Sequence, residues 1–506
     1  MGANLSTASW YEQVSRPAPG TFGLRGRVVF ILGLAAAIAG LNLYAPAAPG
    51  VTERLLASGA LILAALPTWL WLGGTDRNLP FMPFFGFAYA AIFLAPLFLV
   101  PDYRVNWSTA EIQPQLITRA LELIGLGLLC VMAGYYGPQR ALVEQFLPRI
   151  QLRWERPGFI TLGGVVFGIA GLASYGLVRN FPDQLQMVVA FAGDLCAIGI
   201  CMLFALQLVG LLDRLSTLFL WMVLVPARIW LGLATGLTSE GLSVVMLMLL
   251  LYASIRRRIP WAAIAIGGLL FFILRPVEGN YRFAQGYAMR SATVLEKSKL
   301  LIAIGEQTVV PMIDGNSGAY DASMEVASRR LSVDLLTFAA VIGDTPRAVP
   351  YWRGATYYPI LFKLVPRFLY PDKPQEVTGQ TFGHRYGLLD AYNFQTSYNL
   401  PQLIESYINF GVGGVIIVMF LLGMLYRAVQ GVLVHPRMGL GAVILGSYLC
   451  TGLLNIESAA SFVIGVAVWT FVYVGLLNLV IQSGELHATP PGRVANTEFS
   501  AIGHEL

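Results

Sequence analysis

The chain has 506 residues, of which 56% are hydrophobic and only 12% are charged, and its formal net charge is +5. Soluble proteins carry about twice this charged fraction, so the composition excludes an ordinary soluble domain and indicates a membrane protein. The small excess of positive charge gives no sign of a nucleic-acid partner.

Apolar blocks of about 20 residues, the length that a helix needs to cross a bilayer, recur along the chain. They predict an all-α, polytopic membrane protein with about 12 transmembrane helices. The predicted spans are 28–47, 55–73, 80–100, 115–136, 158–178, 186–210, 215–234, 238–254, 259–274, 408–428, 439–455 and 460–481.

The spans fall into two groups, within residues 28–274 and 408–481, and a large loop domain at 275–410 separates them. Tails at 1–27 and 482–506 complete the organisation. When the spans are alternated across the bilayer, fifteen arginines fall on one side and three in the short loops opposite. Because basic loops stay in the cytoplasm, both termini are predicted to be cytoplasmic and the loop domain to face outward.

The loop domain carries 13 Lys/Arg and 12 Asp/Glu, the composition of an ordered soluble segment. Within it, residues 321–342 have apolar side chains at helical spacing and predict an amphipathic helix. Residues 351–370 mix aromatic and basic side chains, which suits a helix lying in the membrane interface. The span at 408–428 is predicted to begin early, with Pro401 near its first turn.

Several kinds of chemistry leave no motif in this sequence. It contains no Walker loop, no Asp-x-Asp pair, and no G-x-S-x-G or Cys-His arrangement. The four cysteines all lie inside apolar blocks, where they behave as small hydrophobic side chains. We therefore predict neither a cofactor nor a metal ion.

Arg228 follows Pro226 in the outer half of the predicted span 215–234. A charge at the centre of a membrane helix costs roughly 2.5–3.5 kcal/mol on insertion scales. Arg228 is therefore expected either to face a functional cavity, or to snorkel to the interface or pair with Glu240. Arg119 and Glu122 also lie in a predicted span, and their spacing of three residues predicts that they pair with each other.

Basic residues on the outer side form the second group of candidates. Arg282 and Arg290 are eight residues apart and would project from similar faces of a helix over 280–295. The others are Arg329, Arg330, Arg347, Arg353, Arg367 and Lys373. Guanidinium groups bind phosphate in a bidentate manner, so converging arginines would form a phosphate site. The alternative is a solvated surface on which each arginine pairs with an acidic neighbour.

His384 and Glu405 are the candidates for proton transfer. Gly383 and Arg385 flank His384 and predict that it lies in a loop, where it acts as a base, binds a sugar, or is a plain surface histidine. Glu405 is expected at the outer end of a span, near water. There it either deprotonates an acceptor hydroxyl or holds an arginine or Tyr407 in place.

Short motifs spread over residues 76–430 resemble those of one enzyme family. They are Asp76-Arg77-Asn78-Leu79-Pro80-Phe81-Met82-Pro83, Arg257-Arg258-Ile259-Pro260-Trp261, Arg275-Pro276-Val277-Glu278-Gly279-Asn280-Tyr281-Arg282, Val365-Pro366-Arg367-Phe368-Leu369-Tyr370-Pro371-Asp372-Lys373-Pro374 and Glu405-Ser406-Tyr407-Ile408-Asn409-Phe410-Gly411. Together they resemble the bacterial Wzy-type oligosaccharide repeat-unit polymerases of O-antigen and exopolysaccharide synthesis.

The resemblance implies a GT-C-like helical enzyme of the bacterial inner membrane with a catalytic periplasmic loop. Such an enzyme transfers a growing glycan from undecaprenyl pyrophosphate to a sugar hydroxyl of another lipid-linked unit, without a metal. It also implies membrane lipids, a flippase and a chain-length regulator as partners. A glycan ligase of the same general type and a transporter of lipid-linked glycans are the alternatives.

The resemblance implies roles for particular residues as well. Arg228, Arg282, Arg329 and Arg367 are the candidates for binding the pyrophosphate. Glu405 or His384 is the candidate for the base that accepts the proton of the acceptor hydroxyl.

Overall fold

The structure is a computed structural model of the whole chain. It describes residues 24–45, 49–74, 79–99, 112–138, 154, 156–177, 183–234, 238–256, 258–285, 292–314, 317–363, 365, 370, 377–394, 396–433, 440–465, 467–468 and 475. Every regular element in this part of the chain is a helix, which confirms the predicted all-α class.

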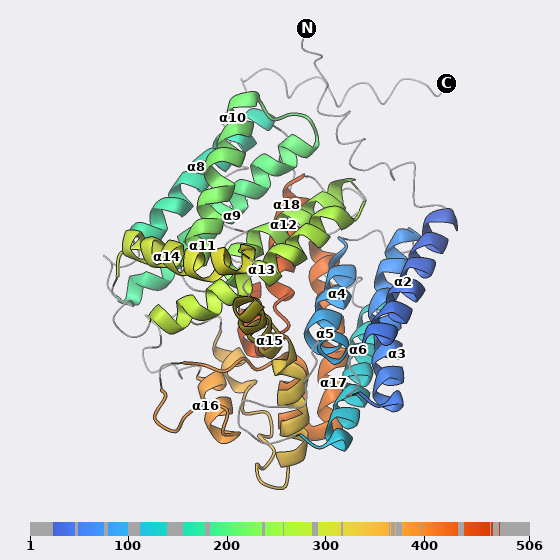
Figure 1. Cartoon of the computed structure of the whole chain (residues 1–506). Coiled ribbons are helices and arrows are strands. Elements are labelled where there is room, and N and C mark those ends of the chain that lie inside the picture. Colours follow the sequence, from blue (N-terminus) through green and yellow to red (C-terminus); the bar gives the residue numbers. More distant parts are fainter. Residues whose placement is uncertain are drawn as a thin grey trace, which may run out of the picture.

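The described residues form eighteen helical elements (Figure 1). They are α2 (Leu24–Tyr44), α3 (Val51–Leu72), α4 (Phe81–Phe93), α5 (Ala95–Leu99), α6 (Pro114–Tyr136), α8 (Pro157–Leu177), α9 (Asp183–Leu208), α10 (Arg214–Phe219), the π-helix η2 (Leu220–Leu224), α11 (Val225–Ala234), α12 (Thr238–Arg256), α13 (Trp261–Gln285), α14 (Val294–Ile313), α15 (Ser317–Asp344), the 3-10 helix η4 (Tyr358–Phe362), α16 (Thr378–Arg385), α17 (Gln402–Leu433) and α18 (Leu440–Leu453).

Six stretches of helix are long and apolar enough to cross a membrane. They are Arg25–Tyr44, Val51–Leu72, Pro114–Tyr136, Pro157–Ser174, Arg214–Ala234 and Gln402–Val432. Shorter apolar helices coincide with five further predicted spans, and the last predicted span, 460–481, falls mostly outside the described residues. The protein is therefore an all-helical membrane protein with six candidate spanning helices in the described part of the chain.

Close backbone approach holds α6 against α17. A Cβ atom on Gly134 would lie 2.1 Å from the Phe420 carbonyl oxygen, and one on Gly423 would lie 2.1 Å from the Val131 carbonyl oxygen. Small residues allow membrane helices to approach in this way and to gain dispersion energy where lipid offers no hydrophobic driving force. The pair α8 and α9 uses the same device, with Gly171 against the backbone of Cys196.

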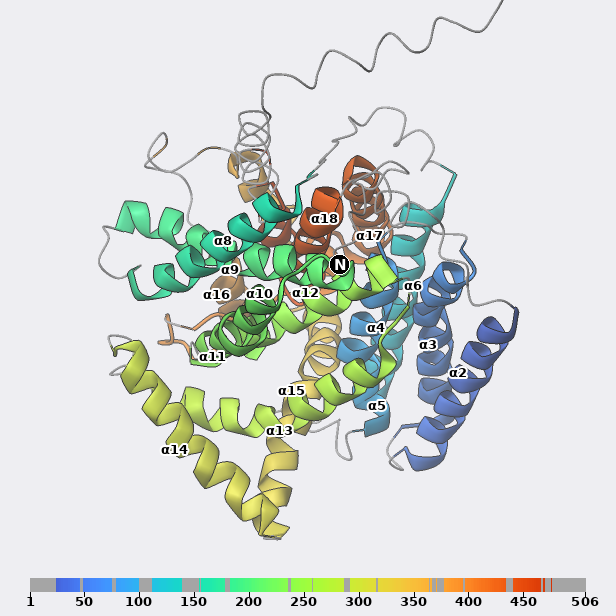
Figure 2. The same ribbon diagram turned by 90° about the horizontal axis from the view of Figure 1, so that it is seen from above.

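The helices form two packed groups that share one core. One group contains α3, α4, α6, α15 and α17, and the other contains α8, α9, α11, α12 and α18. Views from the side and from above show the groups next to each other, with α14 on the outside and α13 in contact with α12, α14 and α15 (Figures 1 and 2). A small separate apolar cluster of Val277, Tyr281 and Leu301 joins α13 to α14.

The loop domain is partly as predicted. The helix expected at 321–342 is confirmed within α15, where Leu335 and Phe338 are buried but Asp334 is buried as well. α17 begins at Gln402, directly after Pro401. The interfacial helix expected at 351–370 is wrong for its described residues, which form turns and the five-residue η4. Arg353 (φ 50°) and Gly354 (φ 88°) have left-handed backbones there, which no α-helix accommodates.

Candidate functional site

The membrane helix α17 is broken near its beginning. Gly411 has φ 63° and ψ −146°, a conformation that only glycine adopts readily, and it divides α17 into residues 402–410 and 412–433. The hydroxyl oxygen of Tyr351 would lie 2.8 Å from a Cβ atom at this position. A break leaves carbonyl groups at the end of the first half without partners inside the helix.

A loop earlier in the chain supplies those partners. The backbone N–H of Trp352 donates to the Ile408 carbonyl (2.9 Å), and that of Arg353 donates to the Asn409 carbonyl (3.2 Å). The N–H of Gly354 donates to Oδ1 of Asn409 (2.8 Å). We call residues 351–357 the cap loop, because they cap the first half of α17.

The cap loop contains a strained residue. Arg353 is the one described residue other than glycine with positive φ, and such a conformation costs roughly 1–2 kcal/mol for an L-amino acid. Two hydrogen bonds to Asn409 hold the backbone of Arg353 in this conformation. The N–H of Arg353 donates to the Asn409 carbonyl, and the N–H of the next residue donates to the Asn409 side chain. Its side chain is exposed. Strain of this kind persists where the surrounding structure enforces it, often at functional sites.

Glu405 lies one turn before the break and is fully buried. Its Oε2 accepts a hydrogen bond from the Ala460 backbone N–H (2.5 Å), at the first residue of the helical stretch 460–465. A carboxylate is stabilised there by this hydrogen bond and by the dipole of the helix. The expectation that Glu405 lies near water is therefore wrong.

Asn409 and Tyr357 complete the surroundings of Glu405. The side-chain N–H groups of Asn409 donate to Oγ1 of Thr356 and to the Glu405 carbonyl, at 2.8 Å each. Burial, and then the nearby charge of Glu405, raises the pKa of Tyr357 far above its usual range. The Tyr357 phenol therefore stays protonated, and its ring stacks on Phe410 with centroids 6.3 Å apart.

His384 and Arg385 end the short helix α16, so the prediction of a loop at His384 is wrong. The His384 ring lies 5.1 Å from the Phe394 ring, centroid to centroid, and is half-buried. The guanidinium of Arg385 lies over the ring of Trp352, 4.8 Å from its centroid, and Arg385 is exposed. The cap loop and α16 thus each contribute one exposed arginine, Arg353 next to Trp352 in the chain and Arg385 over its ring. We call this arrangement, with His384 and Glu405, the cap site.

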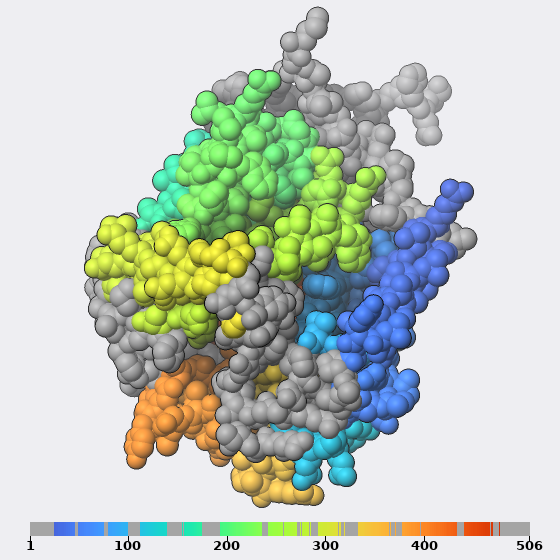
Figure 3. Space-filling model, in the orientation of Figure 1, coloured from blue at the N-terminus to red at the C-terminus, as the bar shows by residue number. Residues whose placement is uncertain are grey.

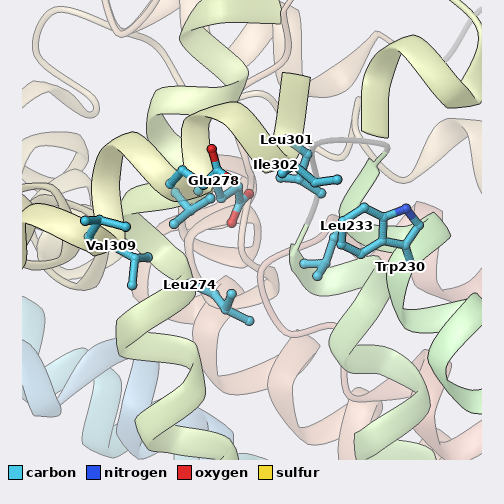
Figure 4. A pocket seen from close by; sticks show the side chains of 11 residues that line it. Trp230, Leu233, Leu274, Glu278, Leu301, Ile302 and Val309 are labelled. Atoms are coloured by element: carbon cyan, nitrogen blue, oxygen red, sulfur yellow. The ribbon is translucent and has the colours of Figure 1, made fainter. Parts of the chain in front are cut away.

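Arg282 belongs to a different place in the fold. An apolar groove of about 380 Å³ lies between α11, α13 and α14. Figure 4 shows Glu278, Leu301 and Trp230 among the side chains that line it. Nη1 of Arg282 lies 3.9 Å from Oε1 of Glu278, and more than half of the Arg282 side chain is exposed. The groove therefore reaches the buried carboxylate of Glu278, and Arg282 contacts that carboxylate from outside the lining.

The remaining candidates are placed as follows. Arg228 is buried in α11, with 5% of its surface exposed, so it does not snorkel into water. The Arg329 side chain and the whole of Arg290 and Arg367 lie outside the described residues. Arg119 forms the predicted ion pair with Glu122 at 2.5 Å. Among the described residues no cluster of His, Cys, Asp or Glu could hold a metal ion.

Sequence reasoning found only part of the cap site. It named Glu405, His384 and Arg353 as candidates, but not Arg385, Trp352 or Asn409. One signal was present: Asn409 lies four residues after Glu405, and polar residues on one face of a membrane helix indicate a polar interior contact. The contact between Trp352 and Arg385 joins residues 33 positions apart and leaves no local pattern.

The fold and the cap site define an all-helical membrane protein with a broken spanning helix capped by a polar loop. The chain belongs to the family described as a domain of unknown function, DUF8712, whose model matches residues 165–487. The match includes both the cap site and the groove. No curated protein and no solved structure matches the chain.

Proposed function

We propose that the protein is a glycan polymerase that extends oligosaccharides carried on undecaprenyl pyrophosphate. The observation that carries the proposal is a pair of exposed guanidinium groups at the cap of the broken membrane helix α17. Arg385 lies over the ring of Trp352, and Arg353 is its neighbour in the cap loop. A lipid-linked diphosphate needs cations at such a position, where its tail can remain in the bilayer.

Arg353 and Arg385 would bind the diphosphate of the donor. As the bond between the anomeric carbon and the diphosphate breaks, negative charge grows on the leaving oxygen, and fixed guanidinium groups stabilise it. The enforced backbone of Arg353 suits this task, because a pre-positioned group needs no reorganisation during the reaction. Arg228, Arg329 and Arg367 stay predicted contributors from the resemblance.

His384 is the candidate base in this proposal. The acceptor hydroxyl oxygen forms a bond to the anomeric carbon, its proton passes to the His384 imidazole, and the diphosphate leaves with the bonding electrons. Glu405 is committed to the N–H of Ala460, so we assign it the positioning of α17 against the helix at 460. It is kept as the alternative base.

The arrangement of the fold supports the proposed orientation. α10, which follows a loop predicted to be cytoplasmic, and α16, which belongs to the loop domain, lie at opposite ends of the molecule (Figure 1). We propose that α16 and the cap loop face the periplasm of a bacterial inner membrane, with both termini in the cytoplasm.

The test is reconstitution of the full chain in lipid vesicles with a purified undecaprenyl-pyrophosphate-linked repeat unit. We expect a ladder of longer products that stay on the lipid, with a rate at least about 100-fold lower for Arg385→Ala. Lys299→Ala, on the exposed surface of α14, is the matched control for loss of a cation and should retain the wild-type rate.

The outcomes separate the alternatives. Transfer of the glycan to a different acceptor, off the lipid diphosphate, identifies a ligase. Movement of the lipid-linked unit across the vesicle membrane with unchanged chain length identifies a transporter. An unchanged product ladder in Arg385→Ala and Arg353→Ala removes the cap site from the reaction.

A further inference from the structure

The groove between α11, α13 and α14 opens on the surface of the molecule. α14 forms an exposed ridge in the space-filling view (Figure 3), and its side chains Leu295, Ile302 and Ile313 are between 49% and 78% exposed. In water such a stripe would be unfavourable, so α14 faces lipid. The groove beneath it is therefore open to the acyl chains of the membrane.

The walls of the groove are apolar, but charged groups of both signs occur in it or at its edge. Glu278 and Glu306 line the groove, and Glu278 is only 6% exposed. Arg282 contacts Glu278 and keeps more than half of its side chain exposed. Two carboxylates and one guanidinium together carry a net charge of −1. The groove therefore favours a ligand that has a cation beside its phosphate over a ligand that has only negative charge.

Trp230 forms one end of the groove. Its indole N–H donates to Oγ of Ser298 on α14 (2.9 Å), which fixes the ring against the helix. An indole face attracts a nearby ammonium group through its negative quadrupole. The ring and the two carboxylates thus favour the same kind of head group.

We propose that the groove binds one zwitterionic phospholipid of the phosphatidylethanolamine type. Its phosphate contacts Arg282, its ammonium donates hydrogen bonds to the carboxylate of Glu306, and an acyl chain lies along Leu274, Val277 and Val309. A lipid diphosphate would place at least two negative charges beside Glu278 and Glu306. The groove is accordingly a lipid site separate from the cap site, and the proposal does not rest on the polymerase function.

The experiment is native mass spectrometry of the full chain in detergent, titrated with dioleoyl phosphatidylethanolamine or with dioleoyl phosphatidylglycerol. The chains of the two lipids are identical, so the comparison isolates the head group. We expect one tightly bound phosphatidylethanolamine and a dissociation constant about tenfold lower than that of phosphatidylglycerol, a difference of about 1.4 kcal/mol.

Two variants test the geometry. Gly305 lines the groove, and a Cβ atom there meets nothing within 4 Å, so Gly305→Leu fills the groove without a clash and should abolish binding of either lipid. Gly268→Leu on α13 is the matched control, because its Cβ also meets nothing and it does not line the groove. The control should bind phosphatidylethanolamine as the wild type does.

Glu306→Gln tests the charge. It should remove the preference, so that phosphatidylethanolamine and phosphatidylglycerol bind with about equal dissociation constants. Asp314→Asn, which removes a carboxylate just beyond α14 and outside the groove, should retain the preference. Equal affinity of the wild type for the two lipids, or tighter binding of phosphatidylglycerol, overturns the proposal. So does binding that survives in Gly305→Leu.

Discussion

Two regions of this protein handle polar groups in opposite ways. At the break in α17, Glu405 and Asn409 are buried, and hydrogen bonds tie them to the cap loop and to the helix at 460. In the groove beside α14, Glu278 is buried, but its ion-pair partner Arg282 is exposed and the walls are apolar.

The difference indicates what each region is built to do. Removing a partner from a buried, hydrogen-bonded centre leaves polar groups unsatisfied, so the centre at Glu405 should be rigid. The groove has space and exposed charge, so a bound molecule can replace lipid or water there without breaking the fold. The first region positions the cap site, and the second is suited to exchange of ligands.

The largest effect is expected for Glu405→Ala. This change removes the acceptor of the Ala460 N–H inside the core and should lower the free energy of unfolding by about 3 kcal/mol. Thermal unfolding in detergent measures it. Glu405→Gln keeps an oxygen acceptor and should lose only about 1 kcal/mol. If Glu405→Gln is stable but forms no polymer, Glu405 is the base and not a positioning residue.

Replacing glycine with alanine should change the free energy of unfolding in opposite directions in the two regions. Gly411→Ala forces a side chain into a conformation reserved for glycine, against Tyr351, and should destabilise the protein by about 2 kcal/mol. Gly305→Ala places a methyl group in open space within a helix and should stabilise it by about 0.5–1 kcal/mol. Equal shifts in Tm would contradict the distinction between a filled centre and an open groove.

Arg353→Gly should separate stability from activity. Glycine accepts φ 50° without strain, so the free energy of unfolding should rise by about 1 kcal/mol, while the loss of the guanidinium lowers the polymerisation rate. Unfolding and product ladders are measured on the same preparation. A variant that is less stable than the wild type would show that the Arg353 side chain, and not its backbone, maintains the cap loop.

The smallest effect concerns pH. Burial raises the pKa of the Asp344 carboxyl at the end of α15 above its ordinary value of 3.8, so the folded protein holds this proton more tightly than the unfolded chain. Stability from this group is present below pH 3.8 and is lost as the pH rises through the folded-state pKa. Asp344→Asn should reduce the dependence of Tm on pH in the range above pH 3.8. If that dependence is unchanged in the variant, it arises from other groups.

The sequence was sufficient for the class and for most of the helices. Runs of apolar residues predict membrane helices because the bilayer imposes one length and one composition. The ion pair of Arg119 with Glu122 was also predictable, since three residues separate its members on one helix. Both are local properties of the chain.

The cap site could not be predicted in the same way. The aromatic and basic residues of 351–370 have the composition of an interfacial helix, but their backbone N–H groups pair with the broken end of α17. The demand for those partners arises at Gly411, more than fifty residues later. Burial of Glu405 likewise depends on the helix at 460, which no pattern around Glu405 reveals.

The joint between the cap loop and α17 has a consequence for variation among related chains. Residues 352–354 and 408–409 are fastened to each other, so the stretch between them begins and ends at one place in the fold. Insertions at exposed positions between α16 and α17, such as Tyr392, would leave the spanning helices undisturbed, whereas changes at 402–407 would alter α17 itself. Related chains could therefore differ in length in this outer connection and keep the membrane scaffold.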